Sequence, residues 1–241
     1  MLKTITIIFY LILPTFVLAQ KIKFRGAGIY GAGLTSAHYY KNDLSTPTII
    51  DTNGNKFYYP QTHISKEFIS WGAGAFAEFS LFRKIRWQTE LEYANKGAQE
   101  MEIVDRMEQR SGTYVANKYT YIQWNNYAKS YTKLIFGSSY WMAGVRVEYL
   151  FRKSAPVFAP YSSNLKSFWF SADLGLGWEI RLTERFYLFT EGHWNPDVIG
   201  QKQDYLKIRN RTVEARIGIT YRPRKQKVDD CNAPVYKGPA Y

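Results

Sequence analysis

The sequence predicts an all-β protein, an eight-stranded antiparallel up-and-down barrel that spans a membrane. Three observations favour this fold class. Apolar and polar residues alternate with a period of two along most of the chain, as in strands with one apolar and one polar face. The connections between these segments alternate between short basic turns and long polar loops. Aromatic residues gather near both ends of the apolar faces, as they do in outer-membrane barrels.

The first residues have the composition of an export signal. A basic residue precedes an apolar run from Ile5 to Ala19, which Pro14 interrupts. The run is too short and too kinked for a comfortable membrane span, so a cleaved secretory signal is predicted. The chain is thus expected to divide into a signal peptide (1–19), an outer-membrane barrel (20–222) and a flexible periplasmic tail (223–241).

Composition and charge restrict the function classes. Lys and Arg number 32 against 20 Asp and Glu, a formal net charge of +12, which points to nucleic acid or an anionic membrane surface. Export argues against nucleic acid. The mean hydropathy of −0.36 excludes a bundle of transmembrane helices but not a membrane barrel. The single Cys cannot form an internal disulfide, and Cys and His show no metal-ligand spacing. We therefore expect no metal and no cofactor.

Four segments alternate most regularly. In 168–180 every even-numbered residue is apolar, whereas Asp173 and Glu179 lie on the odd-numbered face. The same alternation predicts strands over 69–81, 140–151 and 211–221. Weaker patterns predict strands over 24–34, 87–93, 186–194 and, least clearly, 118–128.

The connections orient the predicted barrel. Long polar loops are expected over 37–67, 95–117, 152–166 and 195–209. In outer-membrane barrels the short turns face the periplasm and the long loops face outward. Bases in the short turns and the tail therefore predict a basic band at the periplasmic rim, able to contact anionic headgroups or an acidic partner. These bases are Arg83, Lys84, Arg86, Arg181, Arg185, Arg222, Arg224, Lys225 and Lys227.

The polar faces are expected to form a charged network in the lumen. Its predicted members are Arg25, Glu78, Glu90, Glu92, Arg146, Glu148, Asp173, Glu179, Glu191, Glu214 and Arg216. The interior of an eight-stranded barrel is only wide enough for side chains to fill it, so these charges must pair or be neutralised. Because acids outnumber arginines, some acids must be protonated, hydrated or matched by bases placed elsewhere. We expect a polar plug without an open pore, and a path for protons or small cations is the alternative.

The apolar faces predict a membrane aromatic girdle. Its members are Trp71, Phe79, Trp87, Tyr93, Trp141, Tyr149, Phe168, Trp178 and Trp194. The pairs Trp71 and Phe79, Trp141 and Tyr149, and Phe168 and Trp178 lie eight to ten residues apart, roughly 20–26 Å of depth at about 3.3 Å per residue and a tilt near 40°. An outer-membrane barrel needs an apolar band of about that height. A soluble barrel, the alternative, would need a densely charged outer face.

Short motifs resemble a known family. The segment Ala172–Glu179 looks like the sixth strand of the PorT-like outer-membrane barrels of Bacteroidota, and Glu90–Gly97 is similar to their third-strand ending E-L-x-Y-x-x-K-G. Segments 28–36 and 209–219 resemble their first and last strands. This chain departs from the family in the fourth strand, where family members often have an Ile-Pro step and this chain has Gln123-Trp124-Asn125. It also departs by continuing past the final strand. The resemblance implies an eight-stranded outer-membrane barrel and little about activity. PorT itself serves the type IX secretion system, a role that this general resemblance does not carry over.

Two constellations point to chemistry without meeting its requirements. Gly26, Gly28 and Gly31 match G-x-G-x-x-G, but a dinucleotide site needs a helix at the third glycine, and a crowded first strand explains the run better. His193 lies two residues from Glu191 on the predicted lumen face. A hydrolase of the triad kind also needs a nucleophile beside the histidine, and no Ser stands out. We expect no catalytic residue.

We therefore expect a non-enzymatic integral outer-membrane protein that serves as a structural or accessory subunit of an envelope assembly, secretion systems included. Outer-membrane lipid is its expected surrounding. A protein partner would bind the long loops or the tail, where Val235, Tyr236 and Tyr241 offer apolar anchors. The alternative is a barrel that handles small solutes or lipids, including an enzyme that modifies lipid A.

Overall fold

The computed structural model describes residues 23–42, 48–50, 56–58, 62–80, 85–103, 110–155, 166–197, 201–203 and 206–223. Its long strands are β1 (Lys23–Asn42), β5 (Phe68–Ser80), β6 (Ile85–Ile103), β7 (Arg110–Lys133), β8 (Ser138–Ser154), β9 (Phe168–Arg181), β10 (Phe186–Pro196) and β12 (Leu206–Tyr221). Short strands are β2 (Thr48–Ile50), β3 (Lys56–Tyr58), β4 (Thr62–Ile64) and β11 (Gln201–Gln203). The described residues include no helix with the length and apolar character needed to cross a membrane.

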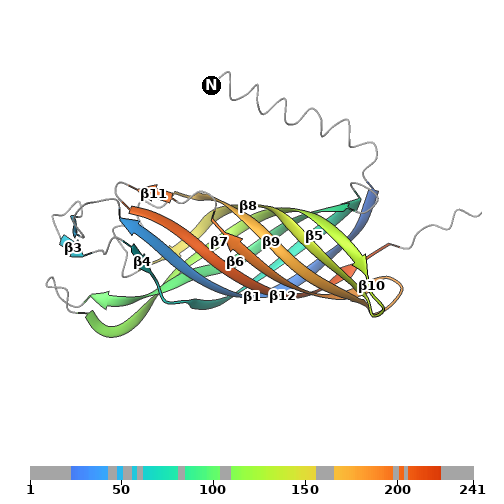
Figure 1. Cartoon of the computed structure of the whole chain (residues 1–241), viewed down its shortest axis with the longest axis horizontal. Coiled ribbons are helices and arrows are strands. Elements are labelled where there is room, and N and C mark those ends of the chain that lie inside the picture. The colour runs from blue at the N-terminus through green and yellow to red at the C-terminus, as the bar shows by residue number, and fades with distance from the viewer. Residues whose placement is uncertain are drawn as a thin grey trace, which may run out of the picture.

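The long strands close into a ring (Figure 1). Each pairs antiparallel with its neighbours in chain order, and β1 pairs with both β5 and β12. The seam between β1 and β12 runs without a register shift from Ala27↔Tyr221 to Asn42↔Leu206. Closure leaves none of these eight strands with an unpaired edge, which a lipid environment requires. The predicted eight-stranded antiparallel barrel is confirmed.

The two ends of the barrel differ. At one end the connections 134–137 and 182–185 are short, and there β1 begins and β12 ends (Figure 1). Gly137 lies in the first of these turns with φ +96°, a backbone conformation that glycine adopts without steric cost. The opposite end carries the small strands β3, β4 and β11 and the longer connections (Figure 1). We call these the short-turn end and the long-loop end.

The predicted extent of the fourth strand is wrong. The strand β7 covers Arg110–Lys133, and much of the loop expected over 95–117 is a hairpin in which β6 and β7 pair from Ile85↔Ser130 to Ile103↔Arg110. The reason lies in the inward residues of β7. Tyr121 and Tyr127 are buried in the lumen while Trp124 is exposed on the outside, so aromatic residues on both faces obscure the alternation.

The lumen also holds an apolar cluster beside its polar groups. Tyr30, Leu34, Phe76 and Phe189 pack together among its buried members. In the first strand, Phe24 and Tyr30 point to opposite sides: Tyr30 is buried in the lumen, whereas Phe24 is exposed on the outside. The register of β1 against β5 shifts between Phe24 and Gly26, and a one-residue shift turns a side chain to the opposite face.

The glycine run of the first strand lies inside β1 and not at the start of a helix. A Cβ added at Gly28 would come within 2.5 Å of the Phe76 ring. Crowding against neighbouring strands thus explains Gly26 and Gly28, whereas a Cβ at Gly31 would meet no atom within 4 Å.

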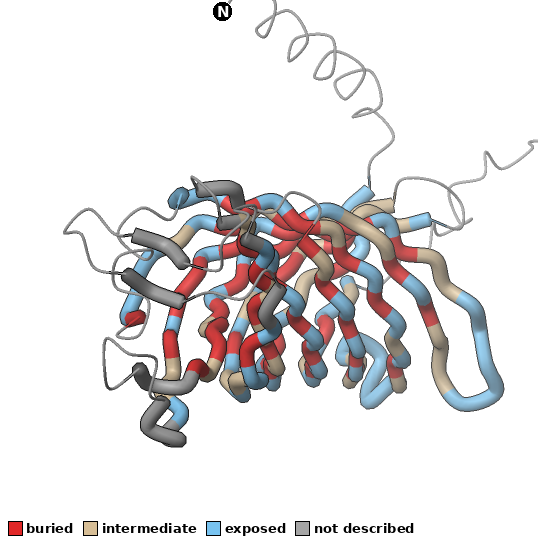
Figure 2. The backbone as a smooth tube through the Cα atoms, turned by 60° about the vertical axis from the view of Figure 1, so that its left-hand side comes forward, coloured by how far each residue is buried: buried red, intermediate tan, exposed pale blue. Residues whose placement is uncertain are grey.

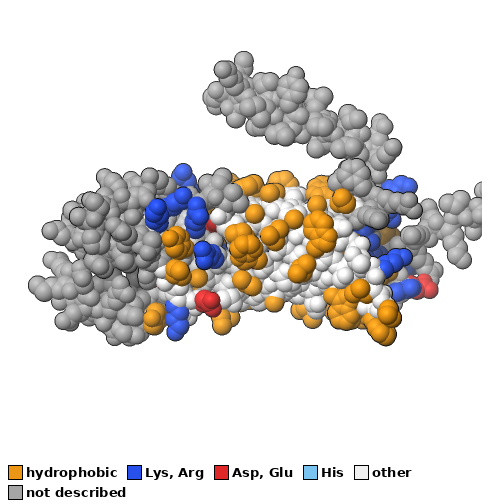
Figure 3. Space-filling model, in the orientation of Figure 1, with side chains coloured by type: hydrophobic (Ala, Val, Ile, Leu, Met, Phe, Trp, Pro, Cys, Tyr) orange, Lys and Arg blue, Asp and Glu red, His pale blue; other side chains and the backbone are white. Residues whose placement is uncertain are grey.

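The outer face is apolar and aromatic. Burial alternates along the strands (Figure 2), and every predicted girdle residue is exposed or half-buried on the outward side: Trp71, Phe79, Trp87, Tyr93, Trp141, Tyr149, Phe168, Trp178 and Trp194. Rings on neighbouring strands stack near both ends, with centroids 5.3 Å apart for Phe79 and Trp87 and 5.2 Å apart for Tyr149 and Phe168. Figure 3 shows the apolar band with Lys and Arg side chains beyond each of its ends.

Candidate functional site

The predicted lumen residues lie together inside the barrel, with one exception. The structure buries Glu78, Glu90, Glu92, Arg146, Glu148, Asp173, Glu179, Glu191, Glu214 and Arg216. The exception is Arg25, which is exposed and donates a hydrogen bond to the Ser80 hydroxyl. Arg25 lies where the pairing of β1 with β5 shifts register, between Phe24 and Gly26, near the short-turn end of the barrel.

Arg216 ties one side of the ring to another. Its guanidinium on β12 lies 3.0 Å from Glu90 and 2.8 Å from Glu92 on β6, a strand that is not its neighbour in the sheet. It also pairs with Glu214 on its own strand at 2.7 Å. The Tyr30 hydroxyl donates to the same two β6 carboxylates. Because all of these side chains are fully enclosed, the lumen is filled at this level.

Arg146 makes a second tie across the lumen. From β8 it reaches Glu214 on β12 at 2.6 Å and Asp173 on the adjacent strand β9 at 2.5 Å. His193 continues the network, with Nδ1 2.9 Å from Asp173 and Nε2 3.1 Å from Glu191. Charge-assisted contacts of this length are strong in a buried site, where an uncompensated charge would be very costly.

A third group lies toward the short-turn end. The Lys129 ammonium on β7 lies 3.1 Å from Glu78 and 3.2 Å from Glu191. The Tyr140 hydroxyl donates to Glu191 at 2.7 Å, and the same ammonium lies 3.9 Å from the centroid of the Tyr140 ring. Lys129 therefore links β5, β7 and β10 around a filled interior.

The predicted basic band at the periplasmic rim is wrong for two of its members. Arg222 turns inward to Glu179 and Glu78, and Arg86 pairs with Glu78 at 3.0 Å. Arg181 and Arg185 are exposed at the short-turn end. Arg83, Lys84, Arg224, Lys225 and Lys227 lie outside the described residues, as do the predicted signal peptide and the predicted tail anchors Val235, Tyr236 and Tyr241.

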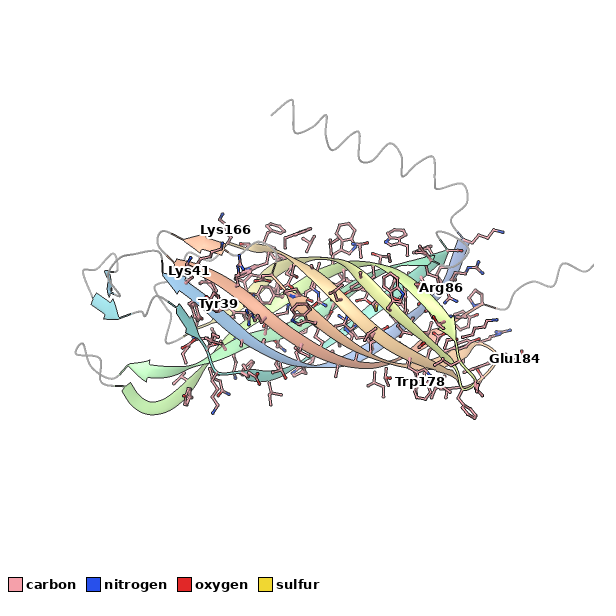
Figure 4. All side chains as sticks on the ribbon, viewed as in Figure 1. Tyr39, Lys41, Arg86, Lys166, Trp178 and Glu184 are labelled. Carbon is pink, nitrogen blue, oxygen red and sulfur yellow. The ribbon has the colours of Figure 1, made fainter. Side chains whose placement is uncertain are left out.

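Exposed bases also lie at the long-loop end. They include Lys41, Lys118, Arg152, Arg209 and Arg211. Figure 4 shows Tyr39, Lys41 and Lys166 at this end and Arg86, Trp178 and Glu184 at the other. The basic excess is thus distributed over both ends of the barrel.

Sequence reasoning missed two buried cations that balance the lumen acids. Lys96 lies 2.7 Å from Glu148, and Lys129 pairs with Glu78 and Glu191. A signal for both exists in the sequence: Lys96 continues the even-numbered inward face of Glu90 and Glu92, and Lys129 continues the odd-numbered face of Asn125. Both lie beyond the predicted ends of their strands, and strand ends are the least certain part of such a prediction.

The geometry around His193 does not provide a nucleophile. Both ring nitrogens are occupied by carboxylates, whereas a triad histidine keeps one nitrogen for a serine or cysteine. The ring is buried. Among those residues, His, Cys, Asp and Glu form no group that could hold a metal ion. The network consists of ion pairs and hydrogen bonds that join strands across the lumen.

A closed antiparallel barrel with an apolar outer band, aromatic rings near both ends and an ionic interior is a transmembrane β-barrel, the class that resides in bacterial outer membranes. The protein is an integral outer-membrane protein, and membrane lipid surrounds its outer face.

Comparison with solved structures finds barrels of this kind. The chain is similar to the outer membrane protein OprG from Pseudomonas aeruginosa, with 14% identity, coverage of 84% of this chain and 98% of that one, and a TM-score of 0.48. It is similar to the Neisserial surface protein A, with 11% identity, coverage of 82% and 99%, and a TM-score of 0.44. It is also similar to the outer membrane protease OmpT from Escherichia coli, with 10% identity, coverage of 83% and 97%, and a TM-score of 0.47.

No protein-family model matches the sequence, and no curated protein matches it. The assignment to the outer membrane therefore rests on the closed sheet and the outer face of this chain.

Proposed function

We propose that this protein is a non-enzymatic outer-membrane barrel with a closed lumen, which serves as a structural or accessory subunit of an envelope assembly. The observation that carries the proposal is the pair of ties across the lumen, Arg216 to Glu90 and Glu92, and Arg146 to Glu214. A barrel filled in this way has no path for a solute. Its interactions must be made at its outer wall, its loops or its ends.

Membership of the PorT-like barrels is part of this proposal. It is supported by the motif Glu90–Gly97, in which Glu90, Glu92 and Lys96 all point into the lumen and enter ion pairs. The motif thus includes residues that fill the barrel interior. The proposed division into a cleaved signal, a barrel and a periplasmic tail follows from the sequence and the short-turn end, where β12 finishes.

Conductance in planar bilayers tests the closed lumen. The full-length protein, shown to be folded by faster gel migration before heating than after, should give no current steps above those of the empty bilayer. A control barrel with an open pore, reconstituted in the same lipid, must conduct in the same setup. Reproducible steps from the folded protein would contradict the closed lumen and favour the small-solute alternative.

A native pull-down tests the accessory role. The full chain should copurify with envelope proteins, and deletion of 223–241 should remove at least one of them. A variant with Val235→Ser, Tyr236→Ser and Tyr241→Ser keeps the length and charge of the tail and should behave like the deletion if these anchors bind the partner. The lipid-modifying alternative would be supported instead if deletion of 223–241 leaves the copurifying proteins unchanged and mass spectra of that strain show altered lipid A.

A further inference from the structure

A groove of about 500 Å³ lies on the outer wall of the barrel, across β5, β6, β7 and β8 near the long-loop end. Its lining includes Ile69 and Trp71, which are 79% and 59% exposed on the lipid-facing side. The groove is therefore separate from the ionic plug, and whatever occupies it approaches from the membrane. Its volume falls in the range of small-molecule sites.

The floor of the groove is polar. The Thr120 hydroxyl donates to Asn95 Oδ1 at 2.9 Å, and the Ser70 hydroxyl donates to the Asn95 backbone oxygen. These hydroxyl and amide groups form a stripe across β5, β6 and β7. Polar groups facing hydrocarbon are costly, so the stripe marks the level at which the apolar band gives way to lipid headgroups.

Two cations border this stripe. Lys118 and Arg152 line the groove, and both are exposed. No carboxylate is among its lining residues. Within the described part of the chain, neither cation forms an ion pair, whereas the buried cations Lys96, Lys129, Arg146 and Arg216 all do. The groove thus presents positive charge suited to an anionic group.

The apolar side of the groove is aromatic. The Trp71 and Tyr93 rings stack with centroids 5.7 Å apart, and Ile69 lies beside them in the lining. Aromatic rings at this depth contact both headgroup and hydrocarbon. An anionic group at the cations would therefore have an apolar surface next to it, directed into the membrane.

We propose that this groove binds a phosphorylated lipid of the outer leaflet. The phosphate lies between Lys118 and Arg152, and an acyl chain lies against Trp71 and Tyr93. Charge complementarity and the position on the lipid-facing wall both favour a lipid over a soluble anion or a protein. The groove would then hold one lipid at a defined place on a barrel whose remaining outer face contacts lipid without selection.

The test is binding of lipid A to the purified, folded, full-length protein in detergent, followed by native mass spectrometry. The double variant Lys118→Gln, Arg152→Gln should bind about tenfold more weakly, because it loses the charge-assisted contacts to phosphate. The matched control Arg209→Gln, Arg211→Gln removes the same charge from the same end of the barrel, on β12, and should bind within about twofold of the original protein. Both variants must keep the heat-dependent gel shift.

Dephosphorylated lipid A separates the headgroup from the acyl chains. The original protein should bind it about as weakly as the double variant binds lipid A. The variant Trp71→Ala should weaken binding of both lipids, because the aromatic wall contacts the chain rather than the phosphate. The proposal is overturned if the double variant binds lipid A as the original protein does, if the β12 control loses as much, or if phosphate removal has no effect.

Discussion

At the scale of single residues, Arg216 has the clearest predicted effect on stability. Replacement by Met keeps much of the side-chain volume but leaves Glu90, Glu92 and Glu214 without their shared cation. Breaking a buried ion pair from one side costs about 3–5 kcal/mol. We expect Arg216→Met to lower the free energy of unfolding by that order, measured by urea denaturation in detergent.

The control for this variant is Arg181→Met at an exposed position of the short-turn end. It should change stability by no more than about 0.5 kcal/mol. If Arg216→Met matches this control, the tie across the lumen contributes no net stability.

Asp197 has a predicted effect on pH dependence. It follows β10 at the long-loop end, where its carboxylate accepts a hydrogen bond from the Asn210 backbone N–H. Burial, and then the nearby Glu148 carboxylate, raise the pKa of Asp197 from 3.8 to about 7. Because the folded pKa is the higher one, the stabilising contribution is fully present below about pH 4 and is lost as the pH rises through about 7.

The measurement is the urea midpoint at about pH 5 and about pH 8. The original protein should be less stable at the higher pH. Asp197→Asn imitates the protonated form and should reduce this difference. An equal pH dependence in both proteins would assign it to other groups.

The residue scale also shows where prediction from sequence succeeds. The inward direction of Glu90, Glu92, Asp173 and Glu214 follows directly from the period of two, because a side chain on a strand can point only to one face of the sheet or the other. Arg25 could not be placed, since it lies where the pairing of β1 with β5 shifts register and alternation no longer fixes the direction of a side chain. The pairing of Arg146 with Glu214 could not be predicted either. Alternation along a strand tells which face of the sheet a residue lies on, but not its position along the barrel axis relative to residues on other strands.

At the scale of elements, adjacent strands depend on matched large and small side chains. Gly177 on β9 faces the lumen, and a Cβ there would come within 2.3 Å of the Tyr140 ring. This ring cannot easily move, because its hydroxyl donates to Glu191 and Lys129 lies over its face. We expect Gly177→Ala to destabilise the barrel by about 1–3 kcal/mol through overpacking, measured by urea denaturation.

The matched control is Gly192→Ala on the neighbouring strand β10. A Cβ at Gly192 meets no atom within 4 Å, and the residue is exposed on the outer side. It should be neutral or slightly stabilising, because alanine restricts the unfolded chain more than glycine does. Equal losses at the two positions would mean that strand propensity, and not lumen crowding, causes the effect.

Some strands were easier to predict from their hydropathy pattern than others. The alternation of β9 and β12 is regular because their outward faces are mostly apolar and their inward faces are mostly charged, polar or small. The strand β7 fills the lumen with Tyr119, Tyr121 and Tyr127, and tyrosine suits either environment. Hydropathy alone therefore could not find its ends, and the length of the β6–β7 hairpin was underestimated.

At the scale of the whole molecule, the closed ring predicts a characteristic behaviour in detergent. We expect a β-sheet signal in far-UV circular dichroism and faster gel migration before heating than after, because the folded barrel is more compact than the unfolded chain. Arg216→Met should show the gel shift at a lower temperature than the original protein. A helical spectrum would contradict the fold. Identical gel migration before and after heating would contradict a barrel that stays folded in the gel detergent.

The seam between β1 and β12 has a consequence for how the protein is made. Partners such as Ala27 and Tyr221 lie at opposite ends of the barrel sequence, so ring closure depends on the most distant contacts in the chain and is slow for that reason. A ribosome that stops before β12 releases a chain whose β1 and β10 each lack a neighbour. Such a chain would present two open strand edges to the periplasm, where they can pair with other proteins. Synthesis of the final strand thus decides between insertion into the membrane and aggregation.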